Sequence, residues 1–161
     1  MFTCPIDDLP IRMNYGSEAA LVESFITCLG SSESPWGDVK IALEFDYQRG
    51  RTDVVAVAHD GHIVAFEAKL DRWRDALNQA YRNTCFAHRS YIVVPQATAH
   101  RAARYHREFV RRKVGLCYVE NGRLEVLLEP PLITPILPWL CERVNQLARS
   151  STQAHVASTC S

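Results

Sequence analysis

Residues 51–69 read RTDVVAVAHDGHIVAFEAK, and this stretch decides the fold. Two runs rich in valine, isoleucine and phenylalanine flank the turn residues 59–61, which is the pattern of a β-hairpin. Because side chains alternate faces along a strand, Glu67 and Lys69 share one face of the second strand. A carboxylate and an ammonium in so apolar a strand cost desolvation free energy, so we expect them to have a partner or a function.

The first strand of this hairpin carries another carboxylate, Asp53. If the hairpin closes with an odd number of loop residues, such as 59–61, Asp53 lies opposite Glu67 with the Cβ atoms about 5 Å apart. A two-residue Asp60-Gly61 turn would instead put the two carboxylates on opposite faces. Two carboxylates this close repel each other unless a cation intervenes, and hard oxygen ligands suit Mg²⁺ or Mn²⁺. The sequence therefore predicts a metal site for phosphodiester hydrolysis, in which Lys69 stabilises the developing charge or orients the attacking water.

Periodicity and turn residues predict further helices and strands around this hairpin. The predicted elements are a helix from Ser17 to Gly30, strands at 39–46, 51–58 and 62–69, a helix from Asp71 to about His88, a strand at 91–94, a basic helix at 98–113 with Thr98 as its cap, a hairpin of 114–120 and 123–128 around Asn121-Gly122, and a helix at 139–148. The order αβββαβαββα favours a single α/β domain with a mixed sheet over residues 1–149. We expect the Ser/Thr-rich end, residues 150–161, to be a disordered tail.

Asp53, followed on the next strand by Glu67-Ala68-Lys69, resembles the PD-(D/E)xK nuclease superfamily, the restriction-endonuclease-like group. The resemblance covers about residues 17–95, and Gln79 matches a glutamine that many relatives carry on the helix after the ExK strand. It implies an αβββαβ core with a mixed central sheet flanked by helices. It also implies Mg²⁺-dependent cleavage of nucleic acid, usually DNA, with metal ligation by the Asp and the Glu and catalytic roles for the lysine and the glutamine.

The match departs from the superfamily at two positions, and it does not decide which glutamate of the first helix belongs to the site. Thr52 stands where the superfamily often has Pro, and Asn83 stands where some branches place Tyr. On the first helix, Glu18 shares the apolar stripe whereas Glu23 does not, so we expect Glu18 to reach the metal site directly or through water, with Glu23 in reserve. The alternative for Glu18 is a first-turn acid that the helix dipole favours.

The middle of the chain is basic although the net charge is zero. Residues 51–113 hold twelve Arg and Lys against six Asp and Glu. Arg51 and the basic helix residues Arg101, Arg104 and Arg111 are therefore our candidates for phosphate contacts with DNA. A solvated helix face is the alternative for the helix arginines.

The remaining composition limits the other function classes. The six cysteines are far apart and form no CxxC pair, so we expect free thiols in a reducing compartment. The sequence has no apolar run near the roughly 20 residues of a membrane span, and residues 1–14 do not resemble a secretion signal, so we expect a cytoplasmic protein. A catalytically inactive nuclease-fold module that binds nucleic acid or joins an assembly is the competing hypothesis. A homodimer or a larger protein assembly is compatible with either function.

Overall fold

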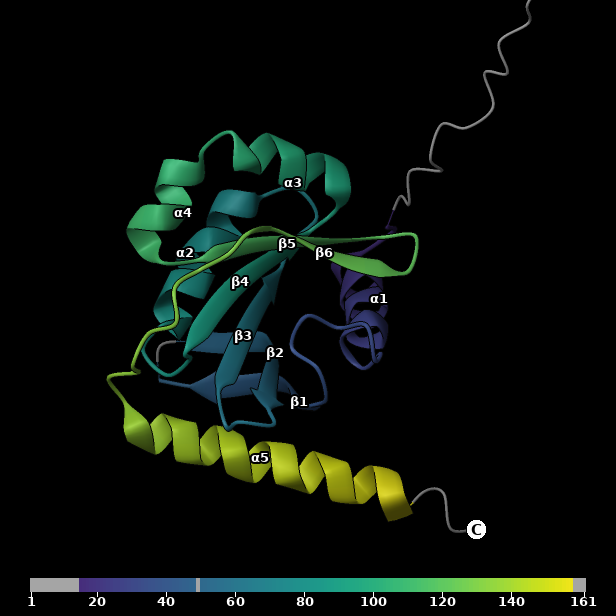
Figure 1. The fold of residues 1–161 in the computed structure, drawn as a ribbon, viewed down its shortest axis with the longest axis vertical. Helices are drawn as coiled ribbons and strands as arrows, with labels where there is room; N and C mark the ends of the chain where they lie inside the picture. Colours follow the sequence, from purple (N-terminus) through teal and green to yellow (C-terminus); the bar gives the residue numbers. More distant parts are fainter. Residues whose placement is uncertain (1–14, 49, 158–161) are drawn as a thin grey trace, which may run out of the picture.

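A computed structural model describes residues 15–48 and 50–157, and its centre is a six-stranded mixed sheet (Figure 1). Neighbours in the sheet follow the chain, with β1, β2 and β3 antiparallel, β3, β4 and β5 parallel, and β6 antiparallel to β5. The strands are β1 (Val39–Tyr47), β2 (Gly50–Ala58), β3 (Ile63–Ala68), β4 (Arg89–Val94), β5 (Gly115–Glu120) and β6 (Arg123–Leu128). The expected mixed sheet and the expected order of helix, three strands, helix and strand are confirmed.

Helices cover both faces of the sheet, as Figure 1 shows. One face packs on α1, and the other packs on α2, α3 and α4, while α5 crosses the sheet at β1 and β2. The helices are α1 (Glu18–Leu29), α2 (Trp73–Asn83), α3 (Gln96–Ala103), α4 (His106–Arg112) and α5 (Pro138–Ala157). No helix among the described residues is long and apolar enough to cross a bilayer.

The β2–β3 hairpin closes with the odd loop that brings its two carboxylates together. Ala58 N–H donates to the carbonyl of His62 at 2.9 Å, which leaves three residues in the loop, and Gly61 takes the left-handed φ of 86° that ends it. The register pairs Val54 with Phe66, so the next pair toward the open end is Asp53 and Glu67. The hairpin therefore has the three-residue loop 59–61 and not the two-residue Asp60-Gly61 turn.

The predicted basic helix at 98–113 is wrong, because two helices, α3 and α4, replace it. Thr98 is not a cap: it lies inside α3, is buried, and its hydroxyl donates to the carbonyl of Leu70 at 2.9 Å. The backbone leaves helical geometry at Tyr105, where φ is −105° and ψ is 36°. There the Tyr105 and Phe109 rings pack on Trp73 of α2, with centroids 5.5 and 5.7 Å away. This long-range packing overrides the local helical pattern.

The ends of two other helices also differ from the prediction. α2 ends at Asn83 rather than near His88, and its buried stripe includes Asn83, whereas Tyr81 is exposed. α5 continues to Ala157 instead of ending at residue 148, so residues 150–157 are not the predicted disordered tail. Hydroxyls of Ser150 and Ser151 donate to carbonyls four residues back, which accommodates both serines within the helix. Residues 158–161 lie outside the described part of the chain, as do residues 1–14.

β1 contains a kink at Glu44, whose φ is 52°. Ile41 and Phe45 are four residues apart, so on a regular strand their side chains would lie on the same face. Here Ile41, before the kink, packs against the α1 core, whereas Phe45, after it, packs against the α5 core. A residue in the left-handed region breaks the alternation of side chains along a strand. The residues on either side of Glu44 pair with those on either side of Asp53, Leu43 with Val54 and Phe45 with Thr52, so the kink lies beside Asp53.

Candidate active site

Glu67 is the most deeply buried acidic side chain among the described residues, with 1% of its surface exposed. Its Oε1 accepts a hydrogen bond from Asn83 Nδ2 at 2.7 Å. The pKa of Glu67 is raised from 4.5 to about 8, mainly by burial and in part by the neighbouring Asp53, whereas Asn83 and Lys69 act in the opposite direction. The fold therefore holds a carboxylate whose charge is poorly solvated and which a cation would stabilise.

Asp53 is the second carboxylate of the site and is only partly buried. Its Oδ2 accepts the backbone N–H of Ala68 at 2.9 Å, directly after Glu67 in the chain. One oxygen of Asp53 and one oxygen of Glu67 are thus each held by an N–H donor. The second oxygen of each carboxylate is the one that a cation would take.

Lys69 lies immediately beyond the end of β3 and pairs with Glu18 of α1, with Nζ 3.0 Å from Oε2. Both residues line a surface cavity of about 440 Å³, together with Gln79, Arg72 and Arg82. The Oε1 atom of Gln79 is buried and has no hydrogen-bond partner among the described residues. The structure thus gathers Glu18, Lys69 and Gln79 around one cavity, whereas Asp53 and Glu67 lie outside its lining.

A three-carboxylate metal site of Glu18, Asp53 and Glu67 is not assembled. Within residues 15–48 and 50–157, no three His, Cys, Asp or Glu side chains are grouped so that they could hold an ion together. Glu18 is engaged by Lys69 instead, and Glu23 is exposed on α1. Asp53 and Glu67 remain the candidate ligands, and paired carboxylates with water completing the shell are the usual protein contribution to a Mg²⁺ site.

Asn83 is the part of the site that the sequence did not reveal. It is buried between Glu67 and two hydroxyl donors, Tyr47 Oη at 2.6 Å and Thr52 Oγ1 at 2.9 Å, which both donate to Asn83 Oδ1. The sequence did contain one signal for this role: Asn83 lies seven residues after Ala76, which places its amide on the apolar stripe of α2. A polar residue on a core-facing stripe requires a buried partner.

The four arginines expected to contact DNA fall into two groups. Arg51 pairs with Asp46 at 2.8 Å, and Arg101 pairs with Asp71, so an acidic side chain already accompanies each of them. Arg104 and Arg111 are exposed and take part in none of the ion pairs between described residues. These two are the better candidates for phosphate contacts.

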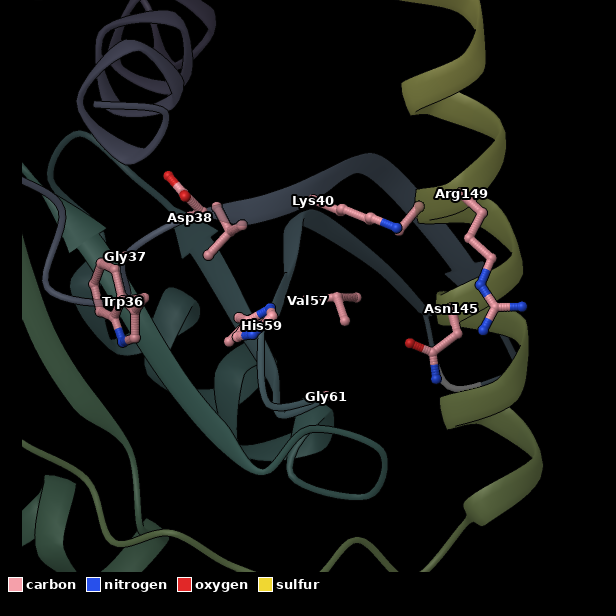
Figure 2. Close-up of a pocket in the computed structure, with 12 residues that line it drawn as sticks. Trp36, Gly37, Asp38, Lys40, Val57, His59, Gly61, Asn145 and Arg149 are labelled. Atoms are coloured by element: carbon pink, nitrogen blue, oxygen red, sulfur yellow. The ribbon is translucent and has the colours of Figure 1, made fainter. Parts of the chain in front are cut away.

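A second cavity, of about 640 Å³, lies between β1, the β2–β3 loop and α5 (Figure 2). Figure 2 shows Lys40 from β1 and Asn145 from α5 directed toward the space between these elements, and Arg149 of α5 also lines it. Its lining contains one carboxylate, Asp38, and none of the predicted site residues. Without paired carboxylates this cavity does not match the metal chemistry, although it is the larger of the two.

Comparison with known proteins gives a fold relative but no family. No protein-family profile matches the chain, and no curated protein does. A protein of unknown function from Silicibacter pomeroyi, SPO1766, is 16% identical over 84% of this chain and 86% of its own, with a TM-score of 0.60, which shows a shared fold. A repair endonuclease from Pyrococcus abyssi is 21% identical over 73% of this chain and 50% of its own, with a TM-score of 0.37. That value is too low to support a conclusion about this chain.

Proposed function

We propose that the protein is a Mg²⁺-dependent nuclease that hydrolyses phosphodiester bonds, in DNA in the first instance, and that Asp53, Glu67 and Lys69 are its central residues. The observation that carries the proposal is the proximity of Asp53 and Glu67, which directly follow the Val54–Phe66 pair of β2 and β3, with one oxygen of each held by an N–H donor. The lysine two residues after Glu67 and the α/β fold with its helix, three strands, helix and strand support it.

The donor set fits a hard divalent cation. The buried Glu67 carboxylate lies beside Asp53, which raises its pKa further, and a cation between the two would remove that repulsion. When bound, such an ion polarises the scissile phosphate and lowers the pKa of a coordinated water. Asp53 and Glu67 would hold it, with Mn²⁺ as an alternative to Mg²⁺.

Lys69 and Gln79 supply the polar groups of the adjacent cavity. Glu18 holds the Lys69 ammonium at 3.0 Å, which fixes its position. A fixed cation beside the scissile phosphate stabilises the negative charge that develops in the transition state. The unpartnered Oε1 of Gln79 can accept a hydrogen bond from the attacking water. Arg104 and Arg111 are the proposed phosphate contacts.

Cleavage of plasmid and linear DNA with Mg²⁺, Mn²⁺ or EDTA tests the proposal. We expect metal-dependent cleavage by the parent protein and a loss of about 100-fold or more in Glu67→Ala and Lys69→Ala. Matched controls change the same residue types elsewhere: Glu125→Gln on β6 and Lys40→Ala on β1, both exposed positions, should cleave at the parent rate. Equal cleavage by the parent, Glu67→Ala and Lys69→Ala would remove the nuclease assignment.

An inactive nuclease-fold module that binds nucleic acid is the second candidate. The finding that favours it is that no three ligand-type side chains are grouped in the described ranges 15–48 and 50–157. DNA binding that is unchanged by EDTA, without cleavage under any metal condition, would establish this candidate in place of the nuclease.

A further inference from the structure

We propose that Asn83, held by Tyr47 and Thr52, is a positioning residue that fixes Glu67 for metal binding. This inference rests on the proposed function and deepens it. All four side chains are buried, and each comes from a different element: Tyr47 from β1, Thr52 from β2, Glu67 from β3 and Asn83 from α2. Their hydrogen bonds converge on a single amide.

The two hydroxyls determine how the Asn83 amide is oriented. Tyr47 and Thr52 both donate to Oδ1, at 2.6 and 2.9 Å, so Nδ2 faces Glu67 at 2.7 Å. Burial is the main reason why the pKa of Tyr47 is raised to about 12, so its phenol stays protonated and remains a donor. A carboxylate that binds a cation can only accept hydrogen bonds, and Nδ2 is the donor that it requires.

This orientation has a consequence for Glu67. With Oε1 held by Asn83, rotation of the carboxylate is restricted, and Oε2 is the oxygen that an ion shared with Asp53 would take. Partners that orient a metal ligand in this way reduce the reorganisation needed when the ion binds. A network that only stabilised the fold would have no need of an ionisable group, because an apolar core of the same volume would be at least as stable.

The two departures from the superfamily pattern are hydrogen-bonded to each other. Thr52 stands where Pro is frequent and Asn83 stands where Tyr occurs, and here the Thr52 hydroxyl donates to the Asn83 amide. Proline has no side-chain donor, so a Pro at position 52 could not make this contact. Thr52 pairs with Phe45 of β1 and its side chain reaches Asn83 of α2, whereas Val54 on the same strand packs against the α1 core.

Two measurements on the full chain test the positioning role. Calorimetry gives the Mg²⁺ affinity, and the unfolding midpoint in EDTA gives the stability without metal. We expect Asn83→Leu, and the milder double variant Tyr47→Phe with Thr52→Val, to bind Mg²⁺ about 10- to 100-fold more weakly than the parent. Excess Mg²⁺ should restore most of their cleavage, because the defect is in affinity. The double variant keeps the shape of the core and serves if Asn83→Leu does not fold.

Ser90→Ala is the matched control, because it removes another buried hydroxyl that bonds α2, at 2.7 Å from the carbonyl of Ala80, and this hydroxyl makes none of the hydrogen bonds of the Asn83 network. It should lower the unfolding midpoint and leave the Mg²⁺ affinity unchanged. Parent-like Mg²⁺ affinity in Asn83→Leu or in the double variant would reduce the network to a structural role and overturn this inference, while the nuclease proposal would stand. A parent protein that binds no Mg²⁺ and cleaves nothing would overturn both.

Discussion

Replacing Glu67 with Gln should make the metal-free protein more stable while abolishing the proposed nuclease activity. The pKa of Glu67 is about 8 in the fold against an ordinary 4.5, with burial as the main cause. At pH 7 the folded chain therefore keeps a proton on Glu67 that the unfolded chain releases, which costs the fold about 3 kcal/mol. Glutamine keeps the acceptor for Asn83, can donate to Asp53, and carries no charge, so the variant should recover most of that free energy.

The sign of the pH dependence follows from the raised pKa. Between pH 4.5 and 8 the folded chain retains a proton on Glu67 that the unfolded chain releases, so the parent loses stability as the pH rises through this window. The difference between Glu67→Gln and the parent should be below about 1 kcal/mol at pH 5 and about 3 kcal/mol at pH 7. A proton-linked effect of this kind is absent from the variant at every pH.

Urea unfolding in EDTA, followed by tryptophan fluorescence, measures this difference. With a slope of about 2 kcal/mol per molar urea, the midpoint of the variant at pH 7 should lie about 1.5 M above that of the parent. Glu125→Gln, at an exposed position on β6, should change the midpoint little at any pH. Added Mg²⁺ should stabilise the parent and not Glu67→Gln. A variant less stable than the parent at pH 7 to 8 would refute the assignment of Glu67 as a strained, buried carboxylate.

The remaining predictions concern backbone positions and DNA contacts. Gly115→Ala would place a Cβ 2.5 Å from the buried Tyr91 ring, so it should lower the free energy of unfolding by about 1–3 kcal/mol in urea titrations, and an unchanged midpoint would contradict the contact. Gly122→Ala meets no atom but occupies a φ of +71°, so a smaller loss of about 1 kcal/mol is expected by the same measurement. Removing Arg104 or Arg111 should weaken DNA binding and reduce its logarithmic salt dependence by about one per phosphate contact, and binding isotherms at several salt concentrations with an unchanged slope would exclude that contact.

The hairpin could be predicted from sequence because its evidence is local. Alternation along the strands, together with the turn at 59–61, sets the register that pairs Val54 with Phe66 and so brings Asp53 near Glu67. The order of the helices and strands follows from the same periodicities. Features of this kind depend on residues that are close together in the chain.

The support around the carboxylates could not be predicted in the same way. Tyr47 and Asn83 are 36 residues apart and meet only after β1 kinks and α2 packs on the sheet. The division of the basic helix at Tyr105 likewise depends on Trp73, which lies on α2. In both places a contact between distant elements determines the local structure, and the propensities of neighbouring residues do not contain that information.

The kink at Glu44 also has a consequence for strand pairing between two copies of the protein. β1 is an outer strand of the sheet, so one row of its amides and carbonyls has no partner strand in the described structure. A straight outer strand is a template for strand addition and for aggregation. The left-handed residue at position 44 interrupts that template near its middle, and an incoming strand could pair with only a few residues on either side. The same kink that lies beside Asp53 thereby also protects the open edge of the sheet.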